Sequence, residues 1–109
     1  MKHKNSQKRI YVPEGIYFIT TNTQDFYPYF EERIFGEVCL SRLRMCKQTK
    51  KFKLFAWIIC RNHLHLLIQP GKDFNFSKIM QFLKKHVSRD INYLITLYQL
   101  KGEIDQSRL

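Results

Sequence analysis

The chain has 109 residues, a length that suits one domain with a small hydrophobic core. Hydrophobic residues make up 44% of the sequence, which is enough for a packed interior. Nineteen Lys and Arg against nine Asp and Glu give a formal charge of +10, which favours a polyanionic partner, most simply nucleic acid. No apolar stretch approaches the length of a membrane-spanning helix, so we expect no membrane association.

The start of the chain and the cysteines both point to the cytoplasm. Residues 1–13 are expected to form a basic N-terminal arm, which lacks the apolar stretch of a secretory signal. The three cysteines are an odd number without C-x-x-C spacing, and each falls within an apolar segment. We therefore predict free, buried thiols in a reducing cytoplasm for Cys39, Cys46 and Cys60.

The first half of the chain predicts a strand and then a helix. Residues 15–21 are rich in β-branched and aromatic side chains, as is typical of a strand, and residues 22–28 read as a loop. From 29 to 48 the apolar residues recur at helical spacing. The predicted buried side of this helix comprises Phe30, Ile34, Val38 and Met45, with Phe35, Cys39 and Cys46 beside them.

The second half predicts a hairpin and a second helix. Residues 52–60 and 63–69 read as strands joined by a tight turn at Arg61-Asn62, where Asn tolerates the left-handed conformation. Pro70-Gly71 ends the hairpin, and Asn75 or Ser77 is placed to cap the next helix. Its apolar residues are Phe76, Ile79, Met80, Leu83, Val87, Ile91 and Leu94. Residues 98–109 read as a short polar tail.

This order of elements predicts an α+β fold of the ferredoxin-like type, split β-α-β-β-α(-β). Two helices would cover one face of an antiparallel sheet and leave the other face open. The last strand of that unit would have to come from the tail, where the sequence is short.

The most informative feature is the pair His63 and His65. Alternation along 63–69 points Leu64, Leu66 and Ile68 to the helices, so both imidazoles should lie on the open face. Two imidazoles aimed at one point are half of a metal site. The alternative is a pair of ordinary surface or core histidines, but an exposed pair has little packing value. Third-ligand candidates near in sequence are weak: Gln69 and Asp73.

Basic residues cluster on the second predicted helix, and we expect DNA-backbone contact from Lys84, Lys85 and Arg89. The alternative for any single basic cluster is a solvated surface.

The segment from Trp57 to Ile68, with its Asn-His-Leu-His core, resembles the signature of the HUH single-strand DNA transposases, in which U is a hydrophobic residue. It is most similar to the single-tyrosine insertion-sequence and REP-associated tyrosine transposases. Residues 17–21, 77–84 and 102–108 resemble further stretches of that family. The resemblance spans residues 14–109, which we take as one transposase-like domain.

The resemblance implies a mechanism. His63, His65 and a third polar ligand would hold Mg²⁺ or Mn²⁺ at the scissile phosphate of single-stranded or hairpin DNA. A tyrosine hydroxyl would attack, form a 5′-phosphotyrosine link and release a 3′-hydroxyl, and strand transfer would reverse that step. The resemblance also implies a homodimer.

The sequence departs from this family in two places. The turn reads Cys60-Arg61 where the family usually has Met-Pro. The family's nucleophilic tyrosine and third metal ligand lie on a helix after the fourth strand, and the alignment reaches Leu109 where that strand should begin. The domain is therefore expected to be incomplete at its C-terminus and its strand cleavage impaired. Tyr93 and Tyr98 are the remaining late tyrosines, more readily explained as packing or surface aromatics.

A second class of function remains open. A basic ferredoxin-like sheet also resembles RNA-recognition domains, which bind nucleic acid without catalysis. The histidines on the open face argue against that interpretation. Comparable affinity for RNA and single-stranded DNA, unaffected by a chelator, would favour it.

Overall fold

The computed structural model describes residues 11–101. The elements run in the order β1 (Tyr17–Asn22), the 3-10 turns η1 (Gln24–Phe26) and η2 (Tyr29–Glu31), α1 (Arg33–Lys50), β2 (Lys53–Cys60), β3 (His63–Gln69) and α2 (Phe76–Lys101). This α+β order confirms the predicted fold as far as α2. The predicted basic arm, apart from residues 11–13, and residues 102–109 of the predicted tail lie outside the described residues.

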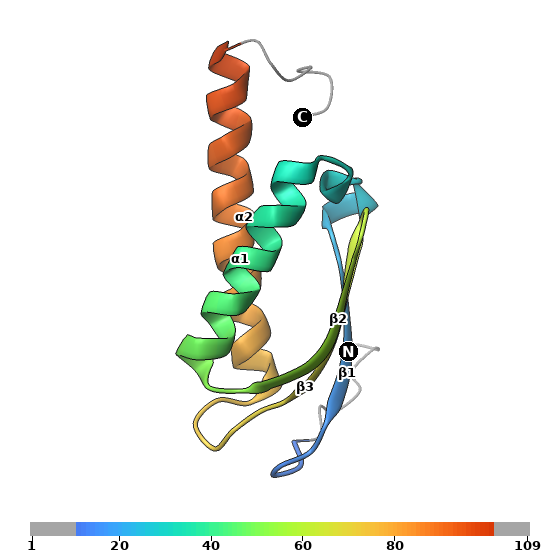
Figure 1. Ribbon diagram of the computed structural model, residues 1–109, viewed down its shortest axis with the longest axis vertical. Helices are drawn as coiled ribbons and strands as arrows, with labels where there is room; N and C mark the ends of the chain where they lie inside the picture. The colour runs from blue at the N-terminus through green and yellow to red at the C-terminus, as the bar shows by residue number, and fades with distance from the viewer. Residues whose placement is uncertain (1–10, 102–109) are drawn as a thin grey trace, which may run out of the picture.

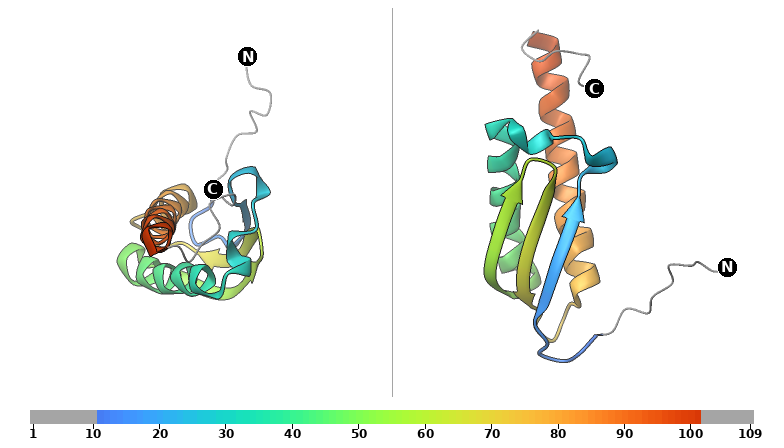
Figure 2. Two further views of the ribbon diagram at one scale, coloured as in Figure 1. Left: turned by 90° about the horizontal axis from the view of Figure 1, so that it is seen from above. Right: turned by 90° about the vertical axis from the view of Figure 1, so that its right-hand side faces the viewer.

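The sheet has the strand order β1-β3-β2, and both pairs are antiparallel. Both helices pack on one face, and the other face is open (Figures 1 and 2). β3 is the central strand because it pairs with both β1 and β2. Its buried side chains alternate along its length: Leu64, Leu66 and Ile68 are at most 4% exposed. A central strand covered on one face shows this alternation, so the predicted direction of β3 is confirmed.

The core lies between the helices and the covered face of the sheet. Its largest cluster consists of Cys39, Leu43, Cys46, Phe52, Leu64, Leu66, Ile68, Ile79, Met80 and Leu83. On α1 the buried stripe is Phe35, Cys39, Leu43 and Cys46. The predicted stripe was centred about one residue too early, and Ile34 is in fact exposed. The helix begins at Arg33 rather than Tyr29 because residues 29–31 form a separate 3-10 turn.

Helix α2 is longer than predicted and continues to Lys101, so residues 98–101 are helical rather than part of a polar tail. Twenty-six residues of α-helix span about 39 Å, which exceeds the strands it covers. Its last turns therefore project past the sheet (Figure 1). Near that end a smaller cluster of Phe35, Ile91 and Ile95 joins α2 to α1. Asn75 caps the helix by accepting a hydrogen bond from the Lys78 N–H at 3.0 Å.

Two further contacts fix the helical layer. Arg42 of α1 donates two hydrogen bonds to the Asp90 carboxylate of α2, at 2.5 and 3.1 Å. Gly71 follows β3, and a Cβ added there would lie 2.8 Å from the Lys51 carbonyl oxygen at the end of α1.

Among the described helices, none is both long and apolar enough to cross a membrane.

Candidate metal and DNA site on the open face

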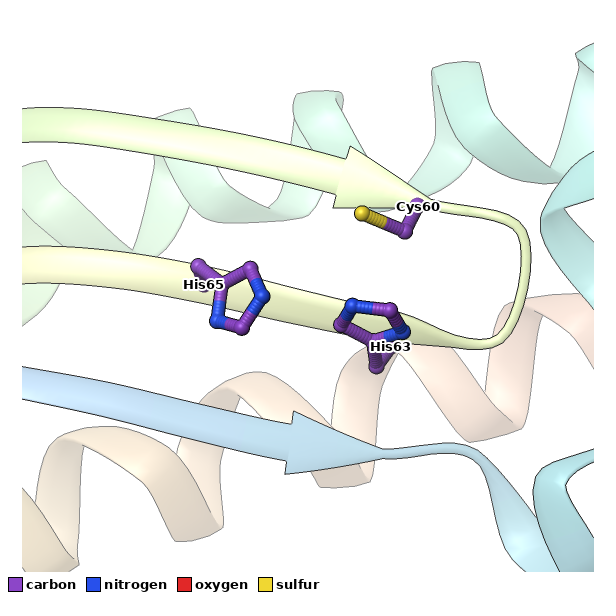
Figure 3. Close-up of side chains that lie close together, drawn as sticks. All are labelled: Cys60, His63 and His65. Carbon is purple, nitrogen blue, oxygen red and sulfur yellow. The ribbon is translucent and has the colours of Figure 1, made fainter.

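The β2–β3 hairpin gathers three metal-ligand side chains at its turn. Cys60 is the direct cross-strand partner of His63, and His65 is two residues further along the same face. One ligand atom from each residue lies within 4.8 Å of the others. Figure 3 shows all three side chains on the viewer's side of the strands, with the helices behind. The prediction that the histidines lie on the open face is therefore confirmed.

Both imidazole rings are held by hydrogen bonds through Nδ1. His63 Nδ1 lies 2.8 Å from Asn62 Oδ1, and His65 Nδ1 lies 2.9 Å from Thr20 Oγ1. Thr20 is opposite His65 on β1. The ring centroids are 4.7 Å apart and the rings are nearly perpendicular. When Nδ1 carries the proton toward these oxygens, each ring keeps the lone pair of Nε2 for a ligand.

The turn that positions His63 is fastened to the loop after β1. Asn62 Nδ2 donates to the Phe26 carbonyl at 3.2 Å, and the Thr23 N–H donates to the Asn62 carbonyl at 3.0 Å. The tight turn was predicted correctly, but Asn62 is not among the described non-glycine residues with positive φ. Its contribution comes instead from its side-chain amide, which bonds the loop and the His63 ring together.

Apolar side chains flank the histidines on the same face. Phe18 of β1 is 68% exposed and stacks on the His65 ring, with centroids 5.4 Å apart and planes 17° from parallel. Ile58 of β2, the cross-strand partner of His65, is 58% exposed. An aromatic ring and an aliphatic side chain left in water beside a polar cluster form a surface on which a flat, partly apolar ligand such as a nucleobase can rest.

Cys60 was not predicted to lie in this cluster. All three thiols were expected to be buried, whereas Cys39 and Cys46 are buried and Cys60 is half-buried. The signal was present in the sequence, because a two-residue turn at Arg61-Asn62 makes residues 60 and 63 cross-strand partners. Gln69, one of the two weak candidates, instead donates its Nε2 to the Glu14 carbonyl at the far end of β3.

The donors of this cluster are two imidazole nitrogens and a sulfur. Mg²⁺ and Mn²⁺ prefer oxygen ligands, whereas imidazole and thiolate suit Zn²⁺ and its neighbours. The cluster contains no carboxylate among the described residues. The donor set thus does not fit the Mg²⁺ or Mn²⁺ that the family resemblance implies.

The two late tyrosines are both on α2, whereas the histidines lie on the face of the sheet that the helices leave open (Figure 3). Tyr93 is 67% exposed and Tyr98 is half-buried. The sheet therefore lies between α2 and the His63 and His65 rings.

The three predicted DNA-contact residues, Lys84, Lys85 and Arg89, are all exposed on α2. Lys84 lines a cavity of about 230 Å³ with the residues that end β1, among them Thr21 and Asn22. Lys85 and Arg89 lie near His86. Partial burial and then the charges of Arg42, Arg89 and Lys85 lower the pKa of His86.

A second cavity, whose charged side chains are mostly basic, lies at the other end of the sheet. It is about 20 Å from His63 along β3 at the usual rise per residue. Its volume is about 920 Å³, and its charged lining includes Lys51, Lys53, Lys72 and Glu14. No local pattern in the sequence connects Lys51 and Lys53 with Lys72. The fold brings them together because the α1–β2 and β3–α2 loops meet at this end (Figure 1).

Comparison with known proteins agrees with the HUH-like hairpin. Residues 14–103 match the family model described as "Transposase IS200 like". A sequence comparison with functionally curated proteins found no significant match.

Two solved structures share the fold. One is a REP-associated tyrosine transposase bound to a REP hairpin, with a TM-score of 0.70, 20% identity and 80% of this chain covered. The other is a Deinococcus radiodurans R1 protein assigned as a transposase, with a TM-score of 0.66, 16% identity and 86% of this chain covered. The chain spans 53% of the first structure and 72% of the second. With most of its length matched by the family model, the chain belongs to the IS200-like transposase family.

Proposed function

We propose that this protein binds single-stranded DNA, with a hairpin beside the bound strand, across the open face of its sheet. The observation that carries the proposal is the anchored His63–His65 pair on an exposed face, flanked by Phe18 and Ile58. A charge of +10 supplies the attraction to phosphate. The structural relative bound to a REP hairpin supports the choice of DNA.

Unpaired bases fit this face better than a duplex does. Exposed apolar side chains at Phe18 and Ile58 offer stacking and contact area, which only unstacked bases can use. A duplex presents mainly phosphates to such a surface. Lys84 lines a cavity with the residues that end β1, so we expect it to contact the backbone of a DNA strand that crosses the edge of β1.

The binding test uses fluorescence anisotropy with a labelled hairpin oligonucleotide carrying a single-stranded extension. We expect it to bind more tightly than a blunt duplex of the same length and charge. Phe18→Ala should weaken binding of the hairpin with little effect on the duplex, and Tyr93→Ala, which removes an exposed aromatic ring on α2 across the sheet from this face, serves as the control. Equal affinity for hairpin and duplex would contradict the proposal.

The family chemistry requires a tyrosine nucleophile, and we propose that this chain binds DNA without cleaving it on its own. Support comes from the position of Tyr93 and Tyr98 on α2, across the sheet from the histidines. Denaturing gels after incubation with the hairpin oligonucleotide and a divalent cation should show no covalent protein–DNA adduct. An adduct that disappears in Tyr98→Phe or Tyr93→Phe would refute this part of the proposal.

A non-catalytic RNA-binding role is the second candidate, and the observation that favours it is the exposed Phe18 ring on the open face of the sheet. The same anisotropy measurement with an RNA of identical sequence separates the two. Tighter binding of RNA than of DNA, unaffected by a chelator, would select this candidate.

We also propose that the functional unit is a homodimer. In the described part of the chain β1 pairs only with β3, so its outer edge offers unpaired backbone groups that another strand can cover. Light scattering coupled to size exclusion should give twice the chain mass. A monomer at micromolar concentration would contradict this.

A further inference from the structure

The geometry points to a zinc-type metal site formed by Cys60, His63 and His65, in which the thiolate of Cys60 is the third protein ligand. This inference rests on the proposed function in one respect: the metal site lies on the same open face that we propose binds DNA. It adds the class of cation that this face binds. The fourth position is open to water or to a phosphate oxygen of bound DNA. Three protein ligands with one open position is the arrangement of zinc sites that bind a substrate.

The distances support this assignment. For tetrahedral Zn²⁺, the usual Zn–N and Zn–S bond lengths place ligand atoms roughly 3.3–3.6 Å apart. In the structure, the three ligand atoms lie within 4.8 Å of one another. A closure of about 1 Å is within reach of side-chain rotation at Cys60, and the hairpin backbone does not have to move.

The ring orientations support it as well. Ligating imidazoles almost always donate their other N–H to an oxygen, which fixes the tautomer and the direction of the lone pair. Thr20 and Asn62 provide such oxygens at 2.9 and 2.8 Å. Both come from outside the ligand set, and Asn62 is itself held by the Phe26 carbonyl. These hydrogen bonds thus preorganise the two imidazole rings for metal binding.

The chemistry of the donors selects the class of cation. A thiolate with two imidazoles favours Zn²⁺, Co²⁺ or Cd²⁺, whereas Mg²⁺ needs an octahedron of oxygens. Tighter binding of Zn²⁺ than of Mn²⁺ is not diagnostic by itself, because almost any site with nitrogen ligands follows that order. The diagnostic observation is direct bonding between the metal and sulfur.

The first test uses tag-free protein and Co²⁺ alone, without DNA. Wild-type protein should develop the near-ultraviolet thiolate-to-cobalt charge-transfer band, and Zn²⁺ should displace it stoichiometrically. Cys60→Ser should lose that band. Both Cys60→Ser and His63→Ala should bind Zn²⁺ about 100-fold more weakly in calorimetry. A Cys60→Ser protein that is folded by circular dichroism and binds Zn²⁺ as tightly as wild type would overturn the proposal.

The second test needs no variant. Cys39 and Cys46 are buried, and burial raises the pKa of each thiol to about 11, so neither should react with iodoacetamide at pH 8 in the folded protein. They are internal controls for Cys60, which mass spectrometry should find alkylated in the apo protein. Zn²⁺ should protect Cys60, whereas Mg²⁺ at the same concentration should not. Alkylation of Cys60 that Zn²⁺ leaves unchanged would also overturn the proposal.

The third test separates this inference from the proposed function. Cys60→Asp replaces the soft ligand with a carboxylate, so the ratio of Zn²⁺ to Mn²⁺ affinity should fall well below that of wild type. Hairpin DNA binding is measured in parallel, with and without chelator. An unchanged affinity ratio refutes the metal site while leaving DNA binding intact, and a protein that binds Zn²⁺ but no hairpin refutes the proposed function alone.

Discussion

The two faces of β3 show how one strand serves two purposes. Leu64, Leu66 and Ile68 are buried under the helices, whereas His63 and His65 alternate with them on the open face. The buried face fixes the register, because a shift of one residue would place both imidazoles in an apolar core. The open face is thereby free to carry chemistry with little influence on folding. Stability and ligand binding should respond to different substitutions on the same strand.

The sharpest way to break this comparison uses two neighbouring leucines. Leu66→Ala removes a side chain that is 1% exposed and should lower the free energy of unfolding by about 2–5 kcal/mol. Leu67→Ala, on the open face, should cost clearly less because Leu67 is only half-buried. Urea denaturation followed by circular dichroism measures both. Equal costs would show that the open face is as important to folding as the covered one.

Two glycines test how tightly the helical layer meets the hairpin. Gly71→Ala places a Cβ 2.8 Å from the Lys51 carbonyl, so it should destabilise the protein by about 1–3 kcal/mol. In Gly36→Ala the new Cβ meets only the Phe30 carbonyl at 4.0 Å, inside α1. The better helix propensity of alanine should there raise stability by about 0.5–1 kcal/mol. Thermal unfolding should show opposite signs, and a neutral Gly71→Ala would refute the close approach.

Two ion pairs sharpen the comparison within the helical layer. Arg42 and Asp90 join α1 to α2 through two hydrogen bonds, and their side chains are only 32% and 29% exposed. A double-mutant cycle with Arg42→Met and Asp90→Asn should give a coupling energy of about 1 kcal/mol. The exposed i,i+4 pair of Arg33 and Glu37 should give no more than about 0.5 kcal/mol. Similar coupling energies for both pairs would mean that the ion pair between the helices stabilises the protein no more than an exposed pair within one helix.

The smallest expected effects concern DNA-backbone contacts on the helix-covered side. Lys84→Gln should weaken hairpin binding and reduce the slope of log affinity against log salt by about 1, as expected for one lost phosphate contact. Lys85→Gln and Arg89→Gln should change it less, because these residues lie near His86 rather than beside the end of β1. Anisotropy titrations between 50 and 200 mM salt, typical of such measurements, distinguish these outcomes. Equal slopes for all three variants would contradict the special position that we assign to Lys84 beside the end of β1.

Much of the fold follows from local pattern. The alternation in 63–69 and the three- and four-residue spacing from 76 to 94 are strong because burial imposes one period on each element. The start of α1 was harder to predict, since residues 29–31 carry aromatic side chains that suit either a helix or a packed 3-10 turn. The buried stripe of α1 was misplaced for a related reason. Apolar residues surround much of this helix, so period alone does not choose between Ile34 and Phe35.

By itself, the sequence determined the order of the elements, the family and the side of β3 on which His63 and His65 lie, because these depend on local period and on a short motif. Only the tertiary structure decided which residues join the histidines. Cys60 lies beside His63 because β2 pairs with β3, and Thr20 lies beside His65 because β1 pairs with β3. At the other end of the sheet, the tertiary structure likewise brings Lys72 close to Lys51 and Lys53, where two loops converge. Such neighbours are set by packing between distant segments, which no single stretch of sequence encodes.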